Sequence, residues 1–215
     1  MMKWMIRSIL SIVAVSLVSP AACALEVLAD NLAASTFGFQ VSNNDTWLAQ
    51  EFVTVSDNTE ITQITLPLIR ADTITAGNYV LAIYGNSGSN TPGSLVQSLT
   101  RTYDTIGTTV SDLNFDVNWT IPTTGSYFLV LHGSGLVGGN IFWKYTNQNG
   151  SSAPFFVGFP SNYTVSVDTG ATWGTPTLET PQVMRIVVPE PSSYVLAVMG
   201  AITLGLTYRR RLRTV

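Results

Sequence analysis

The sequence predicts an all-β fold, an antiparallel, jelly-roll-like β-sandwich, between residues 25 and 188. Short runs rich in Val, Ile, Thr, Tyr and Phe alternate there with clusters of Gly, Pro, Asn, Ser and Thr, as in sandwiches and barrels. No segment of this region keeps a helical period over three turns. Only 11% of the 215 residues are charged, less than half of the roughly 25% in average soluble chains. This composition is typical of an extracellular β-rich domain, and the length favours a single one.

The first 24 residues have the three parts of a secretory signal peptide: a basic start, an apolar run and a small-residue site. Ala22-Cys23-Ala24 matches the A-x-A cleavage pattern, so we expect cleavage after Ala24. A lipoprotein interpretation of Cys23 would need a branched apolar residue where the chain has Pro20. The apolar run spans about ten residues, which is short for a membrane span. The chain after the leader then has no cysteine, so an ordinary core must stabilise it.

Ten runs after the leader have the length and composition of β-strands. They cover residues 47–55, 60–70, 78–84, 95–102, 110–117, 126–132, 141–146, 155–159, 163–168 and 183–188. Apolar residues at every second position from Ile64 to Leu68 predict a strand with one buried face. The runs at 79–84 and 127–131 are apolar on both faces, which predicts central strands. Pro67 cannot donate to a ladder and therefore predicts an edge strand or a bulge.

The chain ends in three consecutive features. Pro189-Glu190-Pro191 is followed by an apolar stretch at 192–208 and then by four arginines, Arg209, Arg210, Arg211 and Arg213. As a helix the apolar stretch would rise roughly 26 Å, the low end of what crosses a ~30 Å hydrocarbon core. We therefore predict a transmembrane helix at 192–208. By the positive-inside rule the arginines stay cytoplasmic, which places residues 25–191 outside the inner membrane.

In this order, the three features resemble the PEP-CTERM sorting signal, which membrane proteases of the exosortase type process. The resemblance covers residues 188–213. It implies that processing at the Pro-Glu-Pro motif removes or replaces the helix during delivery to the cell surface. The implied partners are an exosortase-type protease and, before processing, the inner membrane. The expected organisation is a leader at 1–24, an exported domain at 25–188 and a sorting signal at 189–215.

Five strand and turn motifs between residues 47 and 146 carry a second resemblance. They are Gln50-Glu51-Phe52, Leu81-Ala82-Ile83-Tyr84, Pro92-Gly93-Ser94-Leu95, Gly125-Ser126-Tyr127-Phe128-Leu129-Val130-Leu131 and Trp143-Lys144-Tyr145. The arrangement is similar to the choice-of-anchor class of bacterial surface domains, which occur upstream of PEP-CTERM tails and other anchors. That class implies no established catalytic activity.

The basic residues crowd the two ends of the chain. Residues 25–188 contain four basic and twelve acidic side chains, a net charge of −8. Because such a surface repels phosphate backbones and anionic lipid, its electrostatics argue against nucleic acid as a partner.

The exported domain has few residues that suit catalysis. His132 is the one histidine, and without a G-x-S-x-G elbow the sequence lacks the nucleophile of a Ser-His-Asp hydrolase. We therefore expect His132 to be structural and the protein not to be an enzyme. One histidine and no cysteine cannot supply the usual zinc ligands, so no cofactor is expected. Structural calcium stays open, with oxygen ligands from Asp30, Asn31, Asn43, Asn44, Asp45, Asp112, Asp116 and Asp168.

Three functions stay open. The first is a non-enzymatic surface or matrix protein, structural or adhesive in the exopolysaccharide layer. The second is a lectin-like carbohydrate-binding module, and the third is a secreted glycan hydrolase with two acids facing one cleft. The aromatic residues considered for stacking on sugar rings are Trp47, Trp119, Trp143, Tyr145, Phe155, Phe156, Tyr163 and Trp173. We expect most of them in the core, so an exposed row would favour carbohydrate binding.

Overall fold

The computed structural model describes residues 25–33, 36–54, 56–146, 162–177 and 181–189. Within these ranges the chain forms a short 3-10 helix, η1 (Tyr103–Thr105), and eleven strands. The strands are β1 (Leu25–Asp30), β2 (Gly38–Ser42), β3 (Trp47–Thr54), β4 (Thr59–Arg70), β5 (Ala76–Asn86), β6 (Pro92–Thr102), β7 (Ser111–Ile121), β8 (Gly125–Val137), β9 (Ile141–Tyr145), β10 (Tyr163–Ser166) and β11 (Arg185–Pro189). Residues Val27–Val188 form one compact unit. The remainder of the chain, assigned to a second unit, lies almost wholly outside the described residues.

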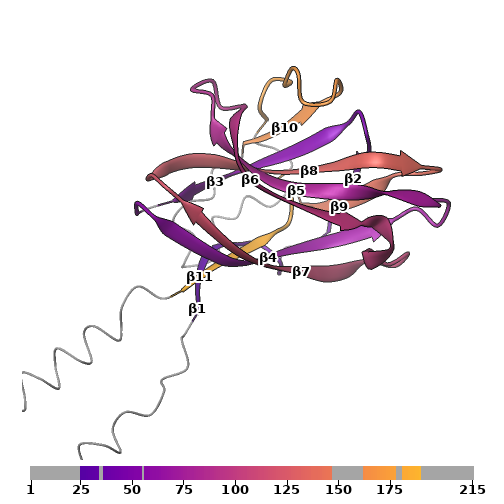
Figure 1. Ribbon diagram of the computed structural model, residues 1–215, viewed down its shortest axis with the longest axis horizontal. Coiled ribbons are helices and arrows are strands. Elements are labelled where there is room, and N and C mark those ends of the chain that lie inside the picture. Colours follow the sequence, from indigo (N-terminus) through magenta and orange to yellow (C-terminus); the bar gives the residue numbers. More distant parts are fainter. Residues whose placement is uncertain (1–24, 34–35, 55, 147–161, 178–180, 190–215) are drawn as a thin grey trace, which may run out of the picture. The chain divides into compact units, whose positions relative to one another are not determined.

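The strands form two sheets (Figure 1). The five-stranded sheet has the order β10-β3-β8-β5-β6. The six-stranded sheet has the order β1-β11-β4-β9-β2, and β7 pairs with the other edge of β4. Apart from β1-β2 and the hairpin β5-β6, consecutive strands lie in different sheets. Because the strand pairs with described registers are all antiparallel, the predicted all-β antiparallel sandwich is confirmed, while the jelly-roll topology stays a prediction.

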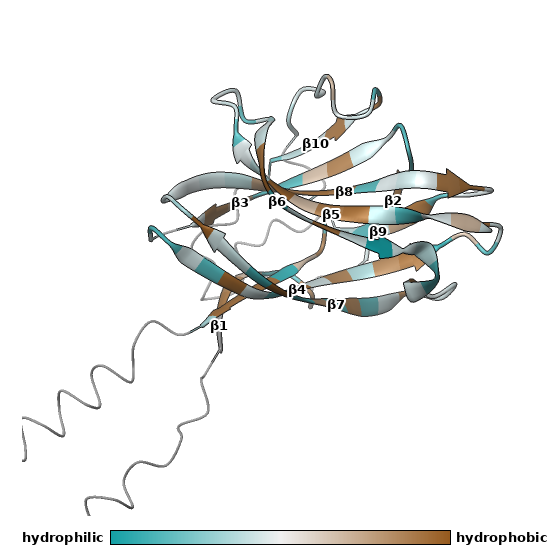
Figure 2. Ribbon diagram, in the orientation of Figure 1, coloured by the Kyte–Doolittle hydropathy of each residue, from teal (hydrophilic) through white to brown (hydrophobic). Residues whose placement is uncertain are grey.

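The apolar core lies between the two sheets. Hydrophobic and hydrophilic bands alternate along β4 (Figure 2), where Ile64, Leu66 and Leu68 lie in the core. In β5, which is apolar on both faces, every second side chain from Tyr79 to Ile83 lies there. The largest fully buried side chains include Trp143, Tyr79, Phe52 and Phe115. Each contributes roughly 1.5–3 kcal/mol by leaving water. The indole N–H of Trp143 donates to Val183 O at 2.7 Å, so this ring is satisfied as well as buried.

Nine of the ten predicted strands are present, and the tenth, at 155–159, lies outside the described residues. The runs at 79–84 and 127–131 lie in β5 and β8, which are interior strands of the five-stranded sheet, as predicted. Sequence reasoning missed β1 and β2. The first and last described strands, β1 and β11, are neighbours in the six-stranded sheet.

The prediction that Pro67 marks an edge strand or a bulge is wrong. Its strand, β4, has partners on both edges, and the register shift lies between Ile61 and Gln63. Pro67 lies opposite Asp112 of β7. On the other edge it falls where the partner of β4 changes from β11 to β9. On that edge Pro67 belongs to neither of the two described strand pairs, so its missing N–H removes no hydrogen bond from them.

Side-chain amides make hydrogen bonds of the kind that a neighbouring strand makes. The amide of Asn44 donates to Leu136 O at 3.0 Å and accepts from Leu136 N at 2.8 Å. In the same way the buried amide of Asn31 donates to Gln182 O at 3.0 Å and accepts from Met184 N at 2.7 Å. These amides satisfy backbone groups that would otherwise be buried without a partner.

A third amide connects the two sheets. Gln50 of β3 accepts a hydrogen bond from Gln182 N at 2.7 Å and donates one to Asn162 O at 3.3 Å. Gln182 lies in the segment that leads into β11 of the six-stranded sheet. The side chain of Gln50 therefore links β3 of the five-stranded sheet to the segment that enters β11 of the six-stranded sheet.

We expect Asn31→Ala to lower the free energy of unfolding by about 2–4 kcal/mol, because it leaves Gln182 O and Met184 N buried and unpaired. Urea unfolding measures this change. The control is Asn118→Ala, since Asn118 is an exposed residue of β7 and should change stability little. Equal effects of the two substitutions would contradict the role given to Asn31.

Candidate functional site

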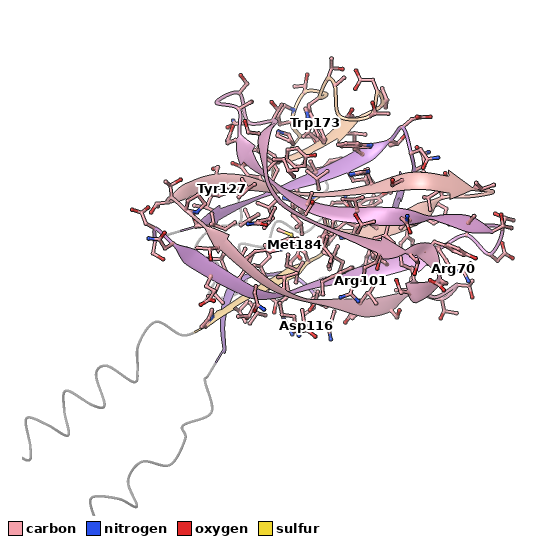
Figure 3. The ribbon with its side chains drawn as sticks, in the orientation of Figure 1. Arg70, Arg101, Asp116, Tyr127, Trp173 and Met184 are labelled. Carbon is pink, nitrogen blue, oxygen red and sulfur yellow. The ribbon has the colours of Figure 1, made fainter. Side chains whose placement is uncertain are left out.

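The five-stranded sheet has one face in the core and one face turned away from it. Figure 3 shows Met184 and Tyr127 between the two layers and Trp173 on the outward side of this sheet. The strand registers align the outward side chains in cross-strand rows. The rows are Ser166-Trp47-His132-Val80, Thr164-Ala49-Val130-Ala82 and Asn162-Glu51-Phe128-Tyr84. The middle row has small side chains, and the two outer rows carry aromatic rings.

Trp47 and His132 form a stacked pair at one end of this face. Their ring centroids lie 3.7 Å apart, with the ring planes 9° from parallel. The Trp47 indole N–H donates to Asn44 O at 3.1 Å. His132 Nδ1 lies 2.8 Å from Gly133 O, which can only accept, so Nδ1 carries the proton. Burial lowers the pKa of His132, against the opposing effect of the bond to Gly133, so the ring is neutral near pH 7.

A tight loop after β10 packs on the stacked pair. Asp168 Oδ1 accepts hydrogen bonds from Thr172 N at 2.8 Å and Ser166 Oγ at 2.7 Å, and Oδ2 accepts from Thr172 Oγ1 at 2.6 Å. These bonds, first those from Thr172, lower the pKa of Asp168 to about 2. Gly170 has a φ of +82°, and a β-carbon there would lie 2.6 Å from Trp47 Cζ3. Only glycine lets the loop approach the indole so closely.

The same loop places Trp173 over the middle row. Gly174 N donates to Val165 O at 2.9 Å, and Thr164 Oγ1 donates to Gly174 O at 2.7 Å, which fixes the end of the loop on β10. Half-buried, Trp173 packs against a small buried cluster that consists of Ala49, Phe128 and Val130. Its indole N–H has no hydrogen-bond partner among the described residues.

Glu51 lies in the third row, with only 2% of its surface exposed. Its backbone N–H donates to Asn162 O at 2.9 Å, and Asn162 Nδ2 donates to Glu51 Oε2. Within the described ranges no basic side chain pairs with this carboxylate. The row continues through Phe128 to Tyr84, which is half-buried. Burial raises the pKa of the Tyr84 hydroxyl, and no described residue bonds to it.

This face combines flat aromatic rings with polar groups that the described chain leaves available. They are the Trp173 indole N–H and the Tyr84 hydroxyl. The carboxylate of Glu51 lies in the same row as Tyr84, but it is buried and accepts a hydrogen bond from Asn162 Nδ2. Aromatic rings pack on the apolar faces of a ligand, while a few polar groups fix its orientation. Hydrolysis of a glycan would need two carboxyl groups facing one cleft. Glu51 is the acidic residue of the three rows, and Asp168 lies in the loop that packs on them.

The eight candidate calcium ligands do not gather at one site, although Asp45 O accepts the N–H of Thr169, next to Asp168. Asp30 Oδ2 lies 2.6 Å from Arg185 Nη2 in an ion pair, and Asp168 bonds within its own loop. The others bond backbone or side-chain groups near them or lie exposed: Asn31, Asn43, Asn44, Asp45, Asp112 and Asp116. No group of three or more His, Cys, Asp or Glu side chains gathers within the described part of the chain.

The candidate stacking aromatics separate into two sets. Trp47 and Trp173 lie on the outward face of the five-stranded sheet. Core-side positions hold Trp119, Trp143, Tyr145 and Tyr163, and the described ranges exclude Phe155 and Phe156. Sequence reasoning missed Tyr84 and Glu51 as site residues. The available signal was the position of Tyr84 two and four residues after Ala82 and Val80, on one face of a strand.

The targeting segments lie outside the described residues. Pro189, the first residue of the predicted sorting motif, ends β11. The undescribed part of that signal comprises Glu190, Pro191, the stretch at 192–208 and Arg209, Arg210, Arg211 and Arg213. The leader, with Ala22 and Ala24, is likewise outside. Among the residues that the structure describes, no helix has the length and hydropathy to cross a membrane.

No family model and no curated protein matches this chain. Among solved structures, TmCBM61 in complex with β-1,4-galactotriose is 15% identical, with a TM-score of 0.30 over 56% of this chain and 78% of that one. BiXyn10A CBM1 in its apo form is 12% identical, with a TM-score of 0.26 over 57% and 95%. The infectious bursal disease virus VP2 subviral particle is 12% identical, with a TM-score of 0.30 over 88% and 50%. At TM-scores this low, the likenesses identify neither a family nor a ligand.

We expect the stability of the protein to fall as the pH drops from 6.5 towards about 5. The unfolded chain binds a proton on His132 near the usual pKa of 6.5, whereas the folded chain does so only at lower pH. Carboxyl groups with lowered pKa values, such as Asp168, lose their contribution only below about pH 4. Urea midpoints at pH 7, 6 and 5 measure the effect. Because His132 is the one histidine, His132→Gln should abolish this decline, and an undiminished decline in that variant would contradict the assignment.

Proposed function

We propose that this chain is an exported bacterial surface protein whose β-sandwich adheres to extracellular polysaccharide and performs no catalysis. One observation carries the proposal: Trp173 and Tyr84 present half-buried rings, with polar tips that no described residue bonds, beside the buried carboxylate of Glu51. The outward face of an antiparallel sheet ordinarily carries polar side chains. Aromatic residues gathered there are typical of a ligand-binding surface.

The charges near this face favour uncharged sugars. Glu51 lies on it, Asp168 belongs to the loop that carries Trp173, and Asp45 O accepts the N–H of Thr169 in that loop. The four basic residues of the exported domain lie on β4, β6, β9 and β11: Arg70, Arg101, Lys144 and Arg185. Arg101 lies over the core ring of Phe115, with Cζ 5.6 Å from the ring centroid. We therefore expect neutral glycans in preference to uronic-acid polymers, with little effect of salt.

Replacing either Trp173 or Tyr84 by alanine should weaken binding to a neutral glycan about tenfold or more, because each change removes a stacking ring. A glycan array probed with labelled residues 25–188 identifies the neutral ligand that binds best. Isothermal titration calorimetry then compares the variants. Phe39→Ala is the matched control, because Phe39 of β2 is an aromatic residue of the other sheet with 40% of its surface exposed. We expect this control to keep wild-type affinity.

Other outcomes of the same experiment distinguish the alternatives. Preferred binding of uronic-acid polymers, or loss of binding in Phe39→Ala with retention in Trp173→Ala, would contradict the proposed surface. Complete absence of glycan binding would favour a purely structural role in the matrix. Turnover of a bound glycan would favour the hydrolase.

We further propose that the C-terminal tail delivers this domain to the surface, as its resemblance to the PEP-CTERM signal implies. The order of Pro189-Glu190-Pro191, the apolar stretch and the arginines supports this. So does the end of β11 at Pro189, because the motif then begins where the last strand ends. Processing after this point would release the sandwich without cutting a described strand.

Glu190→Ala should leave membrane insertion intact and impair processing. A span is recognised by its hydrophobicity and flanking charge, which this substitution hardly changes, whereas a protease that reads the motif contacts Glu190 itself. Expression in a host with the cognate exosortase, followed by mass spectrometry of the C-terminal fragment, measures processing. Removal of the arginine cluster is the comparison, and it should disturb orientation instead. Equal processing of wild type and Glu190→Ala would show that the triplet is only a linker.

A further inference from the structure

Three buried polar atoms at one end of the core have no hydrogen-bond partner among the described residues. They are Tyr163 Oη and both polar side-chain atoms of Gln182, Oε1 and Nε2. Gln182 is 0% exposed and Tyr163 is 5% exposed. In folded proteins such groups almost always have a partner, because an unpaired one keeps its full desolvation cost. Tyr163 and Gln182 therefore need a partner that the described chain does not supply.

Two shared neighbours bring Tyr163 and Gln182 together. Tyr163 lies opposite Gln50 where β10 pairs with β3, and Gln50 Oε1 accepts the Gln182 N–H at 2.7 Å. Tyr145 forms a bridge with Gln182. Burial first, and then the proximity of Tyr145, raises the pKa of Tyr163 far above its usual value. The phenol is therefore protonated and offers one donor and one acceptor.

We propose that this end of the core contains an internal water site, in which at least one ordered water molecule bonds both Tyr163 Oη and the side-chain amide of Gln182. Water matches the chemistry, because the phenol and the amide together offer donors and acceptors, and a buried water typically makes about three hydrogen bonds. The inference does not depend on which way the amide is oriented, since both of its polar atoms are unpaired.

A metal ion fits this site less well than water does. Cations such as calcium are bound by several oxygen ligands with carboxylates among them. Among the described residues, those placed here are Tyr163, Gln182, Gln50 and Tyr145, and all four have uncharged side chains. A bound water would extend the link that Gln50 makes between β3 and the chain entering β11. This site lies on the core side and is independent of the proposed glycan surface.

A crystal structure at a resolution that shows ordered water tests the proposal directly. We expect electron density within hydrogen-bond distance of both Tyr163 Oη and the Gln182 amide. Thermal unfolding of the full chain in detergent gives a second, independent readout. Tyr163→Phe and Gln182→Met keep the side-chain volume and remove the polar groups. Each should lower Tm by about 2–5 °C, because a water that has lost one of its partners is left in the core.

Tyr127→Phe is the positive control. It removes a hydroxyl with a known partner, since Tyr127 donates to Thr123 O at 2.9 Å, and it should also lower Tm. The double variant of Tyr163 and Gln182 should lower Tm by less than the sum of the single variants, because both side chains share one water. Absence of density at the site would overturn the proposal. So would a rise in Tm for Tyr163→Phe or Gln182→Met, because removal of a polar group that truly lacks a partner stabilises a core.

Discussion

Two hydrogen bonds to the backbone of Gln182 join the two sheets, and the position of the last strand depends on them. Gln50 of the five-stranded sheet accepts its N–H, and Asn31, next to β1 of the six-stranded sheet, donates to its carbonyl. One residue further on, Val183 O accepts the indole N–H of Trp143 from the centre of the core. Because a chain that passes between apolar layers needs a partner for every backbone polar group, these side chains determine where β11 enters its sheet. The rest of the apolar core then packs around a fixed last strand.

Residue periodicity predicted most of the strands, and the failures have physical causes. The pattern of β2 is inverted: Phe39 and Val41 are exposed, while Ser42 is buried. The core side of this edge strand is filled by its neighbour, because Tyr145 lies across Gly38, where a β-carbon would be 2.7 Å from the tyrosine hydroxyl. When the inward positions of a strand are small or polar and the outward ones apolar, the alternation of apolar residues does not indicate the buried face. The prediction from Pro67 failed for a related reason. The change of partner strand that accommodates this proline depends on the tertiary fold and leaves no local pattern in the sequence.

The candidate site was predictable only in part. Trp47 and Trp173 were recognised as aromatics able to stack, but which face of a strand turns outward depends on register, which one sequence does not reveal. The difficulty is greatest at β8, where Phe128 on the outward face is as apolar as the core-facing residues beside it. Asp168 was considered a calcium ligand from its residue type. Its oxygens instead accept the bonds that hold the Trp173 loop in place. A loop that folds back on its own sheet cannot be recognised from composition.

The proposed ligand-binding surface is the outward face of the five-stranded sheet. Mapping a bound glycan onto the protein tests this assignment most directly. The measurement is the change in backbone amide chemical shifts of residues 25–188 during titration with a neutral oligosaccharide. We predict that the largest changes fall in β3, β5 and β8 and in the loop at 167–174, with the six-stranded sheet nearly unaffected. Changes concentrated on β2 and β9, where Phe39 and Val41 are exposed, would contradict the assignment and place the ligand on the opposite layer.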